Sequence, residues 1–151
     1  MSEVSYQYNV LSRWTAERNG TVEAQGAMEA ILFSAPPEFK GEPGFWTPEH
    51  FLLAGVASCF TTTLRALAEL SKYEYLGLEV GVTGTLAKGE NGYRFTDVVI
   101  RPSLIVAAER DVDRGLRLLE KAEKACFVTR SLNVKVVLVP RVTVRELSVA
   151  I

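Results

Sequence analysis

One uncharged stretch constrains the fold of this chain more than any other feature. The 14 residues from 51 to 64 carry no charged side chain. The residues just before them have the chemistry of a helix start. Thr47 can cap the first turn, Pro48 fits the first helical position, and Glu49 suits the positive end of the helix dipole. We therefore predict a helix over residues 48–72 that is buried nearly all round in its uncharged part.

Length and charge exclude several classes of protein. A chain of 151 residues can bury a substantial core, and we expect a single domain over residues 1–151. The net charge of −1 predicts no nucleic-acid or anionic membrane partner. No basic region followed by an apolar run opens the chain, and the uncharged run is shorter than the roughly 20 residues of a membrane span. These features predict a cytoplasmic protein.

Apolar periodicity divides the rest of the chain into strands, turns and one more helix. Alternation predicts strands over residues 4–14, 21–25, 27–33, 76–87, 93–106 and 134–144, the last interrupted at Pro140 and the fifth with a bulge or edge at Pro102. Turn or loop residues separate them at 18–20, 34–46 and 88–92. An amphipathic pattern predicts a second helix over residues 109–125. Strands grouped as hairpins favour an α+β fold with mainly antiparallel sheets around two central helices.

Two cysteines could carry chemistry. Cys59 lies in the middle of the first predicted helix and Cys126 at the end of the second, and both fall on apolar faces. They could therefore meet in the core. Without further context, such cysteines are more often small hydrophobic core residues than reactive thiols.

A thiol peroxidase is the functional alternative. The Cys59 thiolate would reduce a hydroperoxide and become a sulfenic acid, which Cys126 would convert to a disulfide. This chemistry needs a cation that lowers the thiol pKa and a carboxylate that holds the cation. Arg18 and Arg130 are candidate cations, and Glu49 is the candidate carboxylate. Alternatively, Glu49 is only a favourable negative charge in the first turn of the helix.

The helix geometry separates Glu49 from Cys59. Ten residues span roughly 15 Å at 1.5 Å per residue, so Glu49 cannot reach the thiol of its own straight helix. It could contribute to a site across a two-fold axis, where the small residues 54–58 would let a second copy approach. We therefore predict a homodimer with two interfacial sites.

Other site types fit poorly. His50 is the single histidine and is expected to be a surface or capping residue. With Cys59 and Cys126 it would give three metal ligands at spacings that match no common zinc pattern, so we predict no metal site. No phosphate-binding glycine loop and no bound cofactor are predicted.

Three motifs resemble one family. Thr47-Pro48-Glu49 followed by Ala57-Ser58-Cys59-Phe60 resembles the Asn-Pro-Glu…Ala-Cys-Phe signature of the OsmC/Ohr family, the osmotically inducible protein C and organic hydroperoxide resistance proteins. The segment 122–132 around Cys126 is similar to its second-cysteine motif. Arg18-Asn19-Gly20 resembles the turn that carries its active-site arginine. Thr47 and Phe127 stand where the family commonly has Asn and Pro.

The resemblance implies an OsmC-like fold, an intertwined homodimer and reduction of hydroperoxides. It makes Cys59 the peroxidatic thiol, Cys126 the resolving thiol, and Arg18 with Glu49 the activating pair. It also implies an external dithiol reductant, either a dihydrolipoyl group or a small dithiol. Arg13 and Arg130 stay open as alternatives to Arg18. A non-catalytic binding dimer with inert cysteines and a stoichiometric redox sensor stay open as alternative functions.

Overall fold

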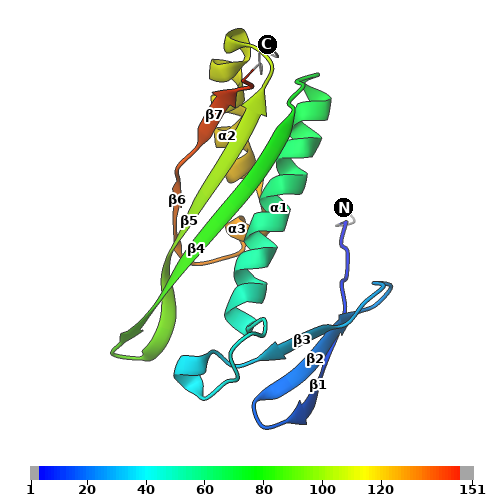
Figure 1. Ribbon diagram of the computed structural model, residues 1–151, viewed down its shortest axis with the longest axis vertical. Coiled ribbons are helices and arrows are strands. Elements are labelled where there is room, and N and C mark those ends of the chain that lie inside the picture. The colour runs from blue at the N-terminus through cyan, green and yellow to red at the C-terminus, as the bar shows by residue number, and fades with distance from the viewer. Residues whose placement is uncertain (1–3, 147–151) are drawn as a thin grey trace, which may run out of the picture. The chain divides into compact units, whose positions relative to one another are not determined.

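The computed structural model describes residues 4–146, which divide into two compact units (Figure 1). The N-terminal unit extends to Leu52 and the C-terminal unit begins at Leu53. The boundary falls inside α1 (Pro48–Leu70), so the N-terminal unit includes the first residues of this helix.

The N-terminal unit is built on one antiparallel sheet with the strand order β1-β2-β3. Its strands are β1 (Val10–Ala16), β2 (Asn19–Ala24) and β3 (Ile31–Ser34), and the loop after them contains the short 3-10 helix η1 (Pro37–Phe39). The three predicted strands and the loop are confirmed, but the first strand starts at Val10 rather than at residue 4, and the third at Ile31 rather than at residue 27. Residues 4–9 alternate in polarity but form no strand; at their end, the Gln25 N–H donates to the Asn9 backbone oxygen at 3.1 Å.

The turn after β1 differs from its prediction. Glu17 adopts the left-handed conformation with φ of 52°, whereas Asn19 and Gly20 already belong to β2. Gly20 is needed there for close packing and not for a positive φ. A Cβ atom at this position would lie 2.6 Å from the backbone oxygen of Arg13 and 2.7 Å from the ring of Phe33.

The C-terminal unit contains a four-stranded sheet of mixed direction. A hairpin joins β4 (Gly77–Gly89) to β5 (Gly92–Val106), as predicted. The predicted last strand is divided into β6 (Lys135–Leu138) and β7 (Arg141–Val144), and both pair with β5 in parallel. The expectation of mainly antiparallel sheets therefore holds for only part of this sheet, because the helical connection after β5 returns the chain in the same direction.

Pro102 of β5 and Pro140 both lie at the interruption between β6 and β7. β5 pairs with β6 through residues 97–100 and with β7 through residues 103–106. Pro102 lies opposite Val80 of β4 without a bulge, and on its other side it falls in the gap at Pro140. The missing N–H of Pro102 therefore costs no ladder hydrogen bond. The register shift of the β4–β5 hairpin lies between Thr85 and Leu86 instead.

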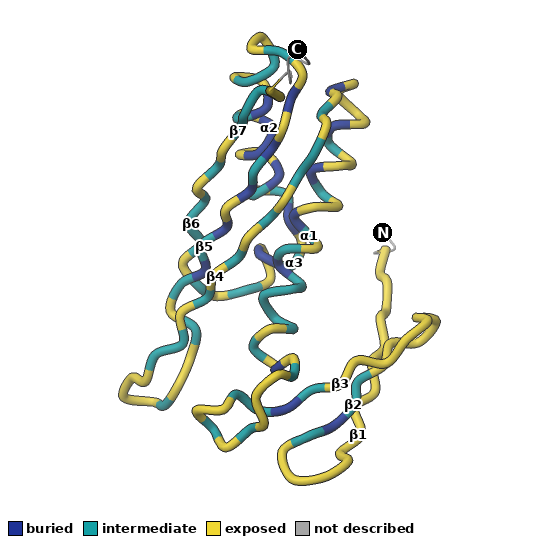
Figure 2. Tube along the Cα trace, viewed as in Figure 1, coloured by how far each residue is buried: buried dark blue, intermediate teal, exposed yellow. Residues whose placement is uncertain are grey.

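The core of the C-terminal unit lies between its sheet and its helices. These are α1, α2 (Val112–Ala125) with the preceding 3-10 helix η2 (Glu109–Asp111), and the short α3 (Phe127–Arg130). Alternate residues of β5 are buried from Val98 to Val106, so one face of the sheet packs against the helices. Figure 2 shows this buried core, in contrast with the largely exposed β1–β3 sheet.

The start of α1 confirms the predicted cap. The backbone N–H of His50 donates to Thr47 Oγ1 at 3.1 Å, and the backbone N–H of Thr47 donates to His50 Nδ1 at 3.0 Å. This reciprocal pair satisfies helix-terminal donors in the manner of a capping box. His50 is therefore a capping residue, as predicted.

Burial of α1 is less complete than predicted. Within this single chain, only the stripe Val56, Phe60, Leu64 and Ala68 is buried, while Ser58 is exposed. By length and composition α1 could also cross a membrane, with a mean hydropathy of 1.5 over an 18-residue window. The core helix of a soluble protein meets the same criteria, although only 22% of this window is buried. α1 thus has more apolar surface than its own chain buries.

Candidate functional site

The C-terminal unit brings two free thiols together. Cys59 lies on α1 and is half-buried, whereas Cys126 is fully buried at the single residue between α2 and α3. Each thiol lies close enough to affect the pKa of the other. The sequence pattern predicted Cys126 at the C-terminal end of the second helix. The structure ends α2 at Ala125, as predicted, and Cys126 forms the junction from which the chain turns into α3.

α3 lies beside α1 near Gly55. A Cβ atom added at Gly55 would lie 3.8 Å from Cγ1 of Val128, which is in α3. At Gly55, the neighbour of α1 is therefore a segment of the same chain. This approach places the backbone that follows Cys126 beside the Cys59 thiol.

Hydrogen bonds favour the thiolate of Cys59. Burial raises the pKa of this thiol, but hydrogen bonds from the Val128 backbone and from the Cys126, Thr63 and Phe127 groups bring it below its ordinary value. The Thr63 hydroxyl, one helical turn further on, lies 3.8 Å from Cys59 Sγ. The described residues of the C-terminal unit thus lower this pKa through neutral donors.

The Cys126 thiol has the opposite tendency. Burial raises its pKa above the ordinary value, and the neighbouring Cys59 adds to this effect. Thr129 opposes the increase, because its hydroxyl donates to Cys126 Sγ at 3.1 Å. Cys59 therefore ionises first, while Cys126 stays protonated and can donate its S–H to the Cys59 thiolate.

This pair of thiols is suited to two-electron redox chemistry. A thiolate is the nucleophilic form of cysteine, and a second thiol in contact with it can close a disulfide once the first is oxidised. Because the Cys59 thiol ionises more readily than the Cys126 thiol, Cys59 is suited to be the attacking thiol and Cys126 the second thiol.

The other two predicted site residues belong to the N-terminal unit. Arg18 lies in the turn between β1 and β2, where its side chain is exposed and its backbone oxygen accepts a hydrogen bond from the Ala35 N–H at 3.3 Å. Glu49 is half-buried in the first turn of α1. One carboxylate oxygen of Glu49, Oε1, is buried and has no hydrogen-bond partner among the described residues. A buried carboxylate oxygen calls for a donor, and a guanidinium group is well suited to this role.

The alternative arginines have different surroundings. Arg13 on β1 pairs with Glu23 on β2 at 2.5 Å, so its charge already has a carboxylate partner. Arg130 lies exposed at the end of α3.

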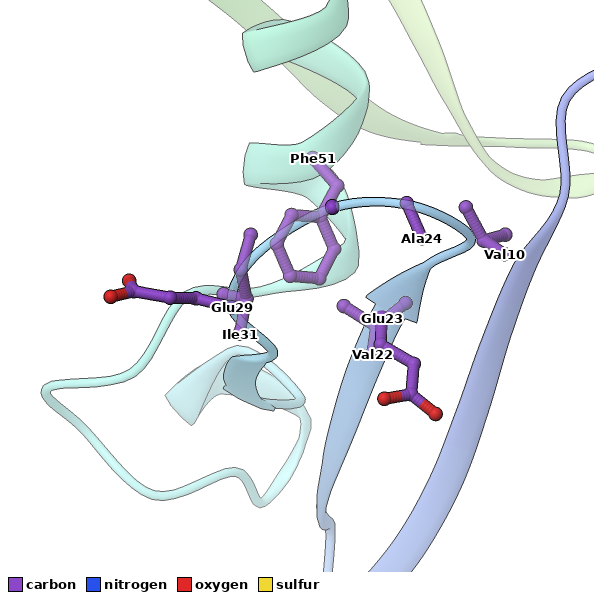
Figure 3. A pocket seen from close by; sticks show the side chains of 8 residues that line it. Val10, Val22, Glu23, Ala24, Glu29, Ile31 and Phe51 are labelled. Atoms are coloured by element: carbon purple, nitrogen blue, oxygen red, sulfur yellow. The ribbon is translucent and has the colours of Figure 1, made fainter.

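A cavity of about 390 Å³ lies in the N-terminal unit (Figure 3). Its lining is mainly apolar, with Phe51 of α1 beside residues of the three strands. The side chains of Glu23 and Glu29 also border it, and Figure 3 shows their carboxylates directed away from the Phe51 ring. The cavity is therefore suited to an apolar group.

Sequence reasoning missed two hydroxyl groups at the thiols, Thr63 and Thr129. The signal for Thr63 was its position four residues after Cys59 on a predicted helix, which places the two on one face. Thr129 gave no comparable signal, because its bond depends on the turn from Cys126 into α3.

Comparisons with known proteins give the family. Residues 41–139 match the family model described as OsmC-like protein. An uncharacterised protein of Bacillus subtilis, YmaD, is 27% identical over 133 residues, which cover 85% of this chain and 87% of that protein.

Solved structures give the same fold. An OsmC-like protein of unknown function from Vibrio cholerae superposes with a TM-score of 0.80 at 21% identity, covering 90% of this chain and 99% of that one. An organic hydroperoxide resistance protein from Legionella pneumophila superposes with a TM-score of 0.74 at 22% identity, covering 93% and 99%. The α+β fold predicted from the sequence is confirmed, and the chain belongs to the OsmC-like protein family.

Proposed function

We propose that this protein is a thiol-dependent peroxidase that reduces organic hydroperoxides, with hydrogen peroxide as a candidate second substrate. The observation that carries this proposal is the contact between two free thiols with opposite pKa shifts. Inert core cysteines need neither the mutual contact nor the donors that stabilise a thiolate at Cys59.

Two steps oxidise the protein. The Cys59 thiolate attacks the terminal oxygen of the hydroperoxide, so that an S–O bond forms, the O–O bond breaks, and the leaving alkoxide takes a proton to become an alcohol. Cys126 Sγ then attacks the Cys59 sulfenic acid. The S–S bond forms, the S–O bond breaks, and the departing hydroxide leaves as water with the Cys126 proton.

An external dithiol completes the cycle. A dihydrolipoyl group or a small dithiol would reduce the disulfide by exchange and become oxidised itself. We place this cycle in the cytoplasm, where reducing dithiols are available.

Arg18 and Glu49 are proposed as the activating pair. The guanidinium would bind the peroxide and favour the thiolate, while Glu49 would hold the guanidinium in position. The unpartnered Glu49 Oε1 supports this role, as does the existing Arg13–Glu23 ion pair, which leaves Arg18 the better candidate.

The active form is proposed to be a homodimer. The β1–β3 sheet exposes large apolar side chains, including Val10, Trp14 and Leu32, and α1 is only partly covered by its own chain. A three-stranded sheet needs a covered apolar face for stability, and a second copy would supply it. Light scattering at micromolar concentration should give the mass of two chains. A monomer would contradict the dimer.

Single-turnover oxidation tests the peroxidase. Fully reduced protein is mixed with one equivalent of cumene hydroperoxide and then analysed by thiol titration and intact mass. We expect both thiols to disappear within seconds and the mass to fall by about two protons. Two free thiols after minutes, also with hydrogen peroxide, would contradict the proposal and favour a non-catalytic OsmC-like dimer.

A further inference from the structure

We infer that Thr129 is a positioning residue for the second oxidation step: its hydroxyl holds Cys126 Sγ in the orientation that attacks oxidised Cys59. This inference rests on the proposed peroxidase function. The Oγ1–Sγ distance is 3.1 Å, and Thr129 and Cys126 are 6% and 0% exposed. Such a buried hydroxyl donor fixes the direction of its acceptor, because no water competes for it.

The hydroxyl of Thr129 differs from most other helical hydroxyls in this protein. Those of Thr61, Ser71 and Ser131 donate to a backbone carbonyl four residues earlier, which is their ordinary local bond in a helix. Thr129 donates to a sulfur atom three residues earlier. Thr129 lies in the first turn of α3, directly after Cys126, so its hydroxyl bonds to the thiol that precedes this helix and not to a backbone carbonyl.

The direction of the hydrogen bonds suits the reaction. While the Thr129 hydroxyl donates to Cys126 Sγ, the Cys126 S–H remains free to point toward Cys59. After Cys59 is oxidised, Cys126 must lose this proton as its sulfur attacks, and the proton leaves with hydroxide as water. Negative charge then develops on Cys126 Sγ within reach of the Thr129 donor, which stabilises it.

The electrostatics of Cys126 support the same role. Burial raises the pKa of this thiol, and Thr129 provides the largest opposing effect. Removing the hydroxyl should therefore leave the attacking sulfur harder to ionise without changing its burial.

The test compares Thr129→Val with Thr129→Ser. Rapid mixing with cumene hydroperoxide separates peroxide consumption by Cys59 from disulfide formation by Cys126. We expect Thr129→Val to slow disulfide formation by about 3–10-fold, the effect of one hydrogen bond, and to leave peroxide consumption within about twofold. The pH midpoint of disulfide formation should rise. Thr129→Ser, which keeps the donor, should restore the rate and the midpoint.

A matched control comes from the same short helix. Ser131 donates to the Phe127 carbonyl in α3, so Ser131→Ala removes a hydroxyl without touching a thiol. It should leave both steps unchanged. If valine disturbs the fold, Thr129→Ala removes the same donor without adding a methyl group in its place, and the same slowing is expected.

A second measurement separates this inference from the proposed function. In a Cys59→Ser background, thiolate absorbance near 240 nm reports the ionisation of Cys126 without any peroxide. Thr129→Val should move this titration to higher pH, and Thr129→Ser should not. An unchanged titration, or equal slowing of both oxidation steps, would overturn the role of Thr129. A wild-type protein that does not react with peroxide would contradict the peroxidase alone.

Discussion

The two units of this protein differ in how much of their apolar surface they bury. The C-terminal unit packs α1 and α2 against one face of its sheet, and residues such as Phe60, Ile100 and Leu119 are fully buried. The N-terminal sheet leaves Trp14 75% exposed and Leu32 59% exposed. The C-terminal unit, which forms a core by itself, thus also carries the thiols. The N-terminal unit, which carries Arg18 and Glu49, lacks a comparable core.

This difference suggests a division of tasks. The C-terminal unit sets the contact and the ionisation of Cys59 and Cys126 with its own donors. The N-terminal unit carries Arg18 and Glu49, the proposed activating pair, and an exposed apolar surface. Each prediction below tests one side of this division, beginning with the largest expected effect.

Cys59→Ser should abolish peroxide turnover, a loss of about 10³-fold or more, because it removes the nucleophile. Cys126→Ser should permit one oxidation and then stall or overoxidise, since the sulfenic acid has no resolving thiol. Steady-state peroxide consumption and intact mass distinguish these outcomes. A fully active Cys59→Ser protein would contradict the role of Cys59 as the nucleophile.

A matched pair of Leu→Ala substitutions tests the two cores. Leu64 is fully buried on α1, so Leu64→Ala should lower the free energy of unfolding by about 2–5 kcal/mol. Leu32→Ala removes an exposed side chain from the N-terminal sheet and should cost a single chain much less. If a second copy covers Leu32, chemical denaturation of this variant should become more dependent on protein concentration. If both variants lost the same free energy of unfolding at every protein concentration, the difference between the two units would be contradicted.

Arg18→Ala should slow the first oxidation step by about 10–100-fold, because we propose that this cation binds the peroxide and favours the thiolate. Arg13→Ala is the control, since Arg13 is already paired with Glu23. Stopped-flow mixing with excess peroxide gives both rates. An unchanged rate in Arg18→Ala would transfer the role to Arg13 or Arg130.

The pH dependence should separate the two thiols. The pKa of Cys59 is lowered, so the first step should lose rate only as pH falls through a midpoint below the ordinary thiol value of 9.0. Thr63→Val removes one neutral donor and should move this midpoint upward. Alkylation rates from pH 5 to 10 in a Cys126→Ser background measure it. A midpoint at or above the ordinary value would show that the donors of the C-terminal unit are insufficient.

The smallest effect is expected at the start of α1. Thr47→Ala removes the hydroxyl that accepts the His50 N–H and should lower the free energy of unfolding by about 1 kcal/mol. Thr47→Ser keeps the acceptor and serves as the control. Thermal denaturation of the three proteins compares them. An unchanged free energy of unfolding in Thr47→Ala would mean that this cap does not stabilise α1.

Much of the fold could be predicted from local patterns. The cap at Thr47, the interruption at Pro140 and the hairpin at residues 88–92 depend on residues close in sequence, and all three were found. The parallel pairing of β6 and β7 with β5 was missed. Periodicity identifies a strand but not its neighbour, so strand direction cannot be obtained from it.

The candidate site shows the same limit. The sequence by itself determined that two thiols lie at apolar positions near two helices and that α1 has a capped start. Only the tertiary structure placed Cys59 against Cys126, turned the chain at Cys126 into α3, and brought the Thr129 hydroxyl to the second sulfur. It also reduced the predicted all-round burial of α1 to one stripe. An absence of charge marks a surface that avoids water, whereas the packing of distant segments decides which part of that surface the chain itself covers.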